Sequence, residues 1–128
     1  MKKIIPLLFT LATCLMISGC GDVSNVGTSP PLSDRYSEQE LNSAYETVKS
    51  YFWKNYDGST LDYISFDDKY NESVREDNIW FYRTDFAPGA DYDILELSVM
   101  YDGNSDLMES FTLSRVGNGS WKVHTHGY

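Results

Sequence analysis

The first twenty residues decide how much of this chain is left to fold. Lys2 and Lys3 precede an apolar run from Ile4 to Ile17. A basic start followed by a short apolar stretch is typical of a secretion signal, which is removed from the mature protein. The run is shorter than the ~20 residues that a membrane-spanning helix needs. We therefore expect residues 1–19 to be a signal peptide.

The apolar run ends in Ile17-Ser18-Gly19-Cys20, which resembles the lipobox of bacterial lipoproteins. In a lipobox, small residues give the signal peptidase access to the backbone, and the thiol of the cysteine takes up a diacylglyceryl group. The resemblance implies cleavage before Cys20 and a protein held by lipid on the outer, extracytoplasmic face of the cell membrane. The alternative is a plain secretion signal, or a buried apolar segment, with a chance cysteine.

The mature chain is expected to be strongly acidic. Loss of Lys2 and Lys3 leaves eight basic against nineteen acidic residues, a net charge of −11. Such a chain is repelled by phosphate backbones, so no nucleic-acid partner is expected, whereas cationic peptides or divalent ions remain possible. Cys14 lies in the apolar run and leaves with it. Cys20 would then be the one cysteine remaining, and the core must hold the fold without an internal disulfide.

The mature chain divides into a linker and one small domain. Residues 20–35 are rich in Gly, Ser, Asn and Pro and show no periodicity, which predicts a lipidated cysteine followed by a flexible tether. Residues 36–128 are enough for a single domain.

The segment from Glu38 to Asn55 has the pattern of an amphipathic helix. Ser37 and Glu40 form a capping box, in which each side chain accepts a hydrogen bond from the backbone N–H of the other. Apolar residues recur behind it at helical spacing, namely Leu41, Ala44, Tyr45, Val48, Phe52 and Tyr56.

The rest of the domain predicts strands. Residues 67–77 are polar and indicate a loop or one helical turn. The expected strands are Thr60–Phe66, Ile79–Phe86, Tyr92–Tyr101, Met108–Val116 and Ser120–His126. Strands at such close spacing form an antiparallel meander. The predicted fold class is α+β, with one N-terminal amphipathic helix packed on a curved antiparallel sheet of about five strands.

The last hairpin can be given a register from its apolar residues. A three-residue loop, 117–119, pairs Leu113 with Val123 and Phe111 with Thr125, and sets Arg115 beside Trp121. A two-residue turn pairs apolar residues less well, and one residue of slip moves every side chain to the other face. The longer loop is therefore favoured, with Gly119 in the left-handed conformation that it needs.

The chain also resembles uncharacterised small lipoproteins of Gram-positive bacteria. The resemblance rests on the lipobox, the tether, one helix, an Ile64-Ser65-Phe66-Asp67-Asp68 strand end and a terminal Trp121-Lys122-Val123 followed by Gly127-Tyr128. Such domains are often similar to the cystatin-like or nuclear-transport-factor-two-like fold, a helix held in a curved sheet. The resemblance implies no catalytic residues. Relatives of this kind carry acids and a tryptophan where this chain has 124–126, which argues against a shared histidine site.

His124 and His126 are the candidate metal ligands. The predicted register puts both on one face of the last strand, opposite Thr112 and Ser110, a spacing found among zinc ligands. No third ligand can be located, so a solvated polar face without tight zinc binding is the favoured interpretation.

Three groups of acids have a chemical and a structural interpretation. The run Asp102–Asp106 resembles the start of a calcium loop, but an EF-hand needs Gly and Glu where Leu107 and Leu113 stand. Turn chemistry explains the run equally well. Asp67 with Asp68, or Asp85 with Tyr82, could form a pocket acid and its partner for acid–base work. In so acidic a chain most carboxylates are surface charge, and no Ser–His–Asp order or free cysteine nucleophile is found in the sequence.

Aromatic residues give the last functional indication. Trp53 and Tyr56, near the end of the predicted helix, are the candidate binding surface, because exposed rings stack on sugars and anchor protein partners. The alternative is that they complete a small core. No cofactor is expected. The favoured function is a non-catalytic binding domain for a cell-surface protein or glycan; a small-ligand pocket and an acid–base enzyme remain alternatives.

Overall fold

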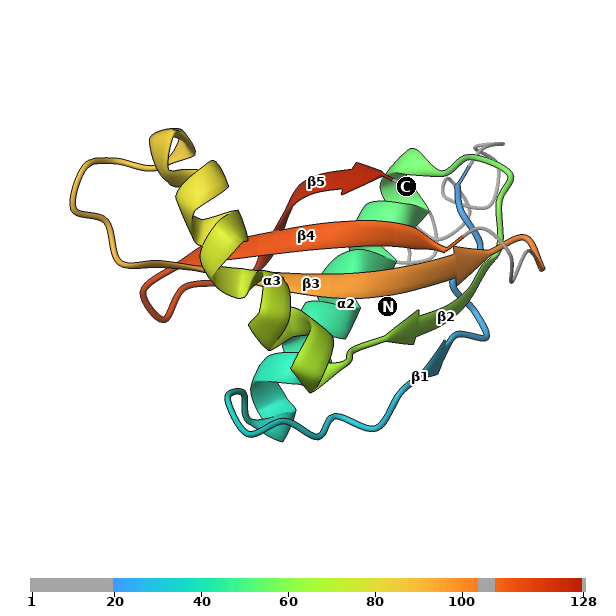
Figure 1. The fold of residues 1–128 in the computed structure, drawn as a ribbon. Coiled ribbons are helices and arrows are strands. Elements are labelled where there is room, and N and C mark those ends of the chain that lie inside the picture. Colours follow the sequence, from blue (N-terminus) through green and yellow to red (C-terminus); the bar gives the residue numbers. More distant parts are fainter. Residues whose placement is uncertain (1–19, 104–107, 128) are drawn as a thin grey trace, which may run out of the picture.

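The computed structural model describes residues 20–103 and 108–127 and has the predicted α+β fold. One mixed, mostly antiparallel sheet has the order β1-β2-β3-β4-β5 and is not closed. Its strands are β1 (Gly27–Thr28), β2 (Leu61–Ser65), β3 (Tyr92–Tyr101), β4 (Glu109–Val116) and β5 (Lys122–Gly127). Helix α2 (Glu38–Asn55) lies on one face of the sheet, and α3 (Asp68–Phe81) crosses the other (Figure 1). In the described part of the chain, no helix has both the length and the apolar character needed to cross a membrane.

Helix α2 has the predicted bounds and the predicted cap. The Ser37 hydroxyl accepts a hydrogen bond from the Glu40 N–H at 3.1 Å, and the Glu40 carboxylate accepts one from the Ser37 N–H at 2.9 Å. The buried residues of the helix are Leu41, Ala44, Tyr45, Val48 and Phe52. Full burial of one large apolar side chain contributes about 1.5–3 kcal/mol, so this stripe holds the helix on the sheet.

The hydrophobic core lies between α2 and the inner face of the sheet. Strands β3 and β4 supply Leu95, Leu97, Val99, Phe111 and Leu113 to it. The alternate residues of these strands point to the opposite face, which is more polar and includes the buried Thr112 and Ser114. The two faces therefore offer different chemistry.

The segment 67–77 is helical, although the sequence predicted a loop or a single turn. The Asp67 carboxylate caps α3 by accepting from the Tyr70 N–H at 3.1 Å. Asn71 is the buried residue of α3, and its Oδ1 accepts from the Glu96 N–H at 3.0 Å. A helix whose buried face is polar leaves no apolar period in the sequence, so the pattern could not be detected.

The predicted strand Ile79–Phe86 is wrong. These residues form the last turn of α3 and a short 3₁₀ turn, η1 (Arg83–Asp85). Trp80 and Phe81 are two of the aromatic residues in this run, and they are 64% and 67% exposed. An exposed aromatic cluster at a helix end therefore looked like a β-rich run.

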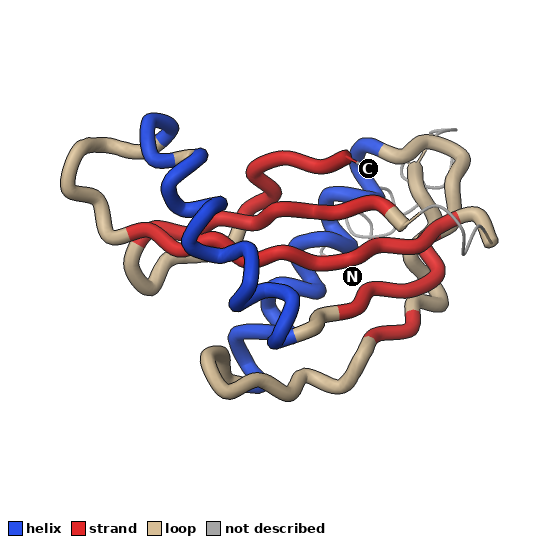
Figure 2. Tube along the Cα trace, in the orientation of Figure 1, coloured by secondary structure: helices blue, strands red, loops and turns tan. Residues whose placement is uncertain are grey.

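Residues 20–35 are bonded along the domain, whereas the sequence predicted a flexible tether. The Gly21 N–H donates to the Trp53 carbonyl at 3.0 Å, and Asp22 forms a parallel bridge with Thr60. Strand β1 then pairs in parallel with β2 and supplies the fifth strand of the sheet (Figure 2). Backbone hydrogen bonds made these polar residues part of the fold, and composition alone does not indicate them.

The register of the last hairpin changes halfway along. Leu113 pairs with Val123 as predicted, but Phe111 pairs with His126, one residue later than predicted. The additional residue is His124, which makes a β-bulge in β5. The bulge moves the side chain of His126 to the face of α2 and leaves His124 on the opposite face.

The turn of this hairpin also differs in detail. Gly117, with φ of 58°, is the left-handed glycine, whereas Gly119 is not among the residues with positive φ. The expected neighbours are confirmed, since the Arg115 guanidinium carbon lies 4.3 Å from the centroid of the Trp121 ring.

Candidate functional site

A groove lies between α2 and the edge strand β5. Its volume is about 470 Å³. The helix wall is formed by small and polar side chains at helical spacing, Ser43, Thr47, Ser50 and Lys54, and the strand side includes Trp121, Lys122 and Val123. Because serine and threonine are short, this stripe leaves open the space that larger residues fill on the core side of the helix. The groove is therefore a shallow channel beside the edge strand β5.

The outer edge of β5 has no strand beside it. Strand β5 is last in the sheet order and pairs with β4 alone. Within the described residues, no backbone hydrogen bond from elsewhere in the chain reaches 122–127. An edge with unpaired N–H and C=O groups is a template for an added strand.

Tyr51 lines the groove and belongs to a polar cluster around Glu109. Glu109 is 4% exposed and accepts hydrogen bonds from the hydroxyls of Tyr56 at 2.7 Å and Tyr101 at 3.0 Å. His126 Nδ1 also contacts this carboxylate, and its Nε2 lies 3.1 Å from the Tyr51 hydroxyl. A carboxylate can only accept, so His126 Nδ1 donates to Glu109, and Nε2 shares a second hydrogen bond with the Tyr51 hydroxyl.

The cluster is satisfied internally and enclosed by rings. His126 stacks on Phe111 with centroids 5.1 Å apart, and Tyr56 stacks on Phe52 at 4.5 Å. Burial raises the pKa of the Tyr56 hydroxyl well above its usual range, and the hydrogen bond to Glu109 raises it further. Tyr56 therefore stays protonated and acts as a donor within the core.

The two predicted binding aromatics separate in the structure. Tyr56 is half-buried against Glu109, as the alternative of a completed core anticipated. Trp53 is 36% exposed beside Val23 and Lys49. Only Trp53 of this pair offers a ring to a partner.

His124 lies on the opposite face in a second arrangement. Its Nε2 is 2.7 Å from Asp85 Oδ2, and its Nδ1 is 3.2 Å from the Ser114 hydroxyl. The imidazole stacks on Phe86 with centroids 5.4 Å apart. These residues line a recess of about 340 Å³ with Lys122. The order Ser114–His124–Asp85, which the sequence did not indicate, is thus brought together by η1, β4 and the bulge.

This arrangement orients the His124 imidazole but does not expose the Ser114 hydroxyl as a nucleophile. Ser114 is 2% exposed, so its hydroxyl cannot meet a substrate carbonyl without movement of the surrounding chain. The Asp85 carboxylate accepts from Nε2–H, and the Ser114 hydroxyl shares a hydrogen bond with Nδ1. Tyr82, which the sequence suggested as the partner of Asp85, packs edge-on against the His124 ring, with the two centroids 4.8 Å apart. The predicted pairing of His124 and His126 on one face is therefore wrong.

The other acids have structural roles. Asp68 accepts from the Ser33 hydroxyl at 2.6 Å and the Asp34 N–H at 3.0 Å, and these bonds hold its pKa below its usual range, the backbone bond most strongly. Asp67 caps α3. Asp102 accepts from the Thr60 N–H at 2.8 Å, while residues 104–107 of the proposed calcium loop lie outside the described residues.

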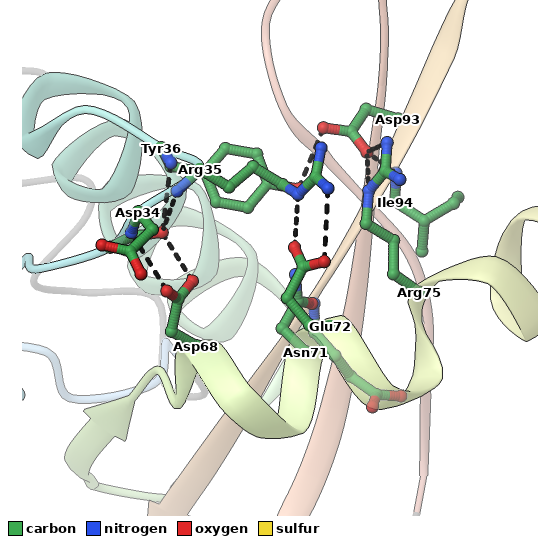
Figure 3. A network of polar contacts seen from close by, with 11 residues as sticks. Asp34, Arg35, Tyr36, Asp68, Asn71, Glu72, Arg75, Asp93 and Ile94 are labelled. Carbon is green, nitrogen blue, oxygen red and sulfur yellow. Dashed lines mark hydrogen bonds and ion pairs between the residues drawn. The ribbon is translucent and has the colours of Figure 1, made fainter.

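Figure 3 shows how the carboxylates near Asp68 tie the chain to α3. Arg35 pairs with Glu72, and Arg75 Nε lies 3.0 Å from Asp93 on β3. The Tyr36 hydroxyl donates to the same Asp93 carboxylate at 2.9 Å. Every one of these acids is engaged in joining segments, which argues against a free acid–base group here.

Trp80 and Phe81 were not among the predicted site residues. Both are exposed, and the Arg83 guanidinium carbon lies 3.8 Å from the centroid of the Trp80 ring. A strand would place consecutive residues on opposite faces, whereas at the end of α3 both aromatic rings are exposed to solvent.

In the described part of the chain, no group of three or more His, Cys, Asp or Glu side chains is placed to hold a metal ion. A comparison of the chain with family models, curated proteins and solved structures finds no match.

Proposed function

We propose that this chain is a membrane-anchored, extracytoplasmic lipoprotein whose domain binds an extended segment of a partner protein in the groove between α2 and β5. The anchor is lipid on Cys20, in keeping with the Ile17-Ser18-Gly19-Cys20 sequence. The function is non-catalytic. A partner at the cell surface suits this location, and the negative chain charge disfavours nucleic acid.

The observation that carries the proposal is the unpaired edge of β5 beside an open groove. An extended peptide can add a strand to such an edge, with main-chain hydrogen bonds giving affinity and alternate side chains entering the groove. Trp121, which lines the groove, has a buried indole N–H without an acceptor among the described residues. A carbonyl of the bound segment would supply one after a small adjustment.

Photo-crosslinking in intact cells tests the groove. A photoreactive residue replaces Ser50, which is exposed in the groove, and in a matched variant replaces Ser73, which is exposed on α3. We expect a discrete adduct from position 50 that is lost when Thr47→Trp fills the groove. Equal adducts from both positions, or an adduct that survives the filling, would contradict the proposal.

The anchor is tested separately. Cys20→Ala should abolish incorporation of a labelled fatty acid and leave an uncleaved precursor. Labelling as strong as that of the unchanged chain would show that the lipid is elsewhere.

A small-ligand site at the recess of Asp85 and His124 is the second candidate. It is favoured by the flat Phe86–His124 stack and by Lys122 at its margin. The recess is open, and its acid and imidazole already satisfy each other, so the groove is preferred. A small molecule whose binding is lost in His124→Ala but kept in Thr47→Trp would reverse this order.

A further inference from the structure

The chain joins the fold immediately after Cys20. Gly21 is buried, and its N–H is bonded to the Trp53 carbonyl at 3.0 Å. A Cβ at Gly21 would lie 2.6 Å from the Phe52 carbonyl oxygen, so the backbone is packed against the end of α2. Asp22 continues the contact through hydrogen bonds to Ser59 and Leu61.

This attachment removes the spacer that the composition suggested. The fifteen residues from 21 to 35, if extended, could hold the domain up to about 50 Å from its anchor. Because Gly21 is already bonded to the domain, the lipidated Cys20 lies only one residue away from the folded chain. The surface around Cys20 is therefore fixed relative to the lipid.

The surface next to this attachment contains an exposed aromatic ring. Trp53 is 36% exposed and lies with Val23 around a shallow hollow. Tryptophan is enriched at the boundary between lipid and water, where its ring sits at the head groups. The charges on this surface are of both signs, with the acids Asp22 and Asp57 and the bases Lys49 and Lys54, so the contact does not depend on anionic lipid.

We propose that the domain lies directly on the lipid surface, with the C-terminal end of α2 against the head groups and Trp53 in the interface. The occupant of this surface is the bilayer that holds the Cys20 lipid. The inference rests on the proposed acylation of Cys20 and adds an orientation to it. The end formed by η1 and the β4–β5 turn then points away from the membrane (Figure 1).

The three tryptophans provide a test of this orientation. Trp53 is at the anchored end, Trp121 is buried, and Trp80 is exposed at the end of α3 beside η1. The protein purified from the membranes of the producing cells is reconstituted in phosphatidylcholine vesicles whose acyl chains carry bromine near the head group. Tryptophan emission is measured against matched vesicles without bromine, and flotation records how much protein is bound.

We expect quenching in the unchanged protein that is lost in Trp53→Phe and kept in Trp80→Phe. An insert of about twelve Gly and Ser residues between Cys20 and Gly21 should preserve flotation and abolish quenching, because it restores a flexible spacer. Flotation without quenching, or quenching that Trp80→Phe removes instead, would overturn the orientation while leaving the acylation intact. Failure of the unchanged protein to float would overturn the acylation, and the orientation with it.

Discussion

Asn71 joins α3 to a stretch of β3 that β2 does not pair. The last pair between those strands is Ser65 with Ser98, and the Asn71 side chain accepts the Glu96 N–H beyond it. Asn71→Ala would leave that N–H without an acceptor, which should cost about 1–3 kcal/mol of unfolding free energy in a denaturant titration. Asn42→Ala, at an exposed position of α2, should cost less than about 0.5 kcal/mol. Equal losses would show that the Asn71 bond contributes nothing.

Glu40 makes the free energy of unfolding depend on pH in the acidic range. The Ser37 N–H, and then Arg115, hold the pKa of this carboxyl below its usual range. A lowered folded pKa contributes stability above the ordinary glutamate pKa of about 4.3, and the contribution is lost as pH falls through the folded value. The loss caused by Glu40→Gln should therefore be largest near neutral pH and shrink toward pH 3. The control Gln39→Ala, in the same helical turn and exposed, removes no titratable group, so its difference in unfolding free energy should not change with pH.

The role of a site residue depends on burial and on partners that the sequence does not show. Trp53 lies in the last turn of α2 and Tyr56 is the C-cap three residues later, yet Tyr56 turns inward to Glu109 and Trp53 stays exposed. The buried acid of the cluster comes from a strand end that gave no signal, since one Glu among nineteen acidic residues is not distinctive. Burial and partners, which arise only in three dimensions, decide the role of such a residue.

Helix α2 was predicted to the residue because local and long-range preferences agree in it. Its cap, its acidic first turn and its apolar stripe all specify the same element. Ser37→Ala should cost about 1 kcal/mol through loss of the cap. Val48→Asp should cost several times more, because it places an unpaired charge in the core. Urea titrations that show equal, negligible losses would contradict the packing of this helix.

Elements that bury polar residues, or that depart from regular geometry, were not predicted from the sequence. Strands β3 and β4 alternate apolar residues and were predicted within one residue of their bounds. Helix α3 buries Asn71 instead of an apolar residue, and β1 is a two-residue strand that pairs with β2 through its backbone. The bulge at His124 followed from neither apolar matching nor turn length, and it reversed the orientation assigned to His126.

At the scale of the whole molecule, the predicted number of strands was correct although one strand was misassigned. The strand expected at Ile79–Phe86 is absent, and β1 takes a place in the sheet from the segment expected to be a tether. The sheet could not be completed from composition, because parallel pairing of β1 with β2 connects residues more than thirty positions apart. The N-terminal segment is consequently both a structural edge and the path to the proposed anchor.

Gly21 connects that path to the core and gives the last prediction. In Gly21→Ala the new Cβ would lie 2.6 Å from the Phe52 carbonyl oxygen and 2.9 Å from its ring. Neither the helix backbone nor a fully buried ring can move freely, so the N-terminal segment must shift, at a cost of about 1–3 kcal/mol. In a domain of this size each kcal/mol lowers the melting temperature by about 4–8 °C.

The control is Gly127→Ala, because a Cβ there meets no atom within 4 Å and its melting temperature should stay unchanged. Hydrogen exchange locates the effect, since the Asp22 and Leu61 amides are bonded to the Ser59 and Asp22 carbonyls. Both amides should lose protection in Gly21→Ala, while the α2 amides keep theirs relative to global stability. If Gly21→Ala melts like Gly127→Ala and protects these amides normally, residues 20–28 are not part of the cooperative fold. The domain would then stand on a tether after all.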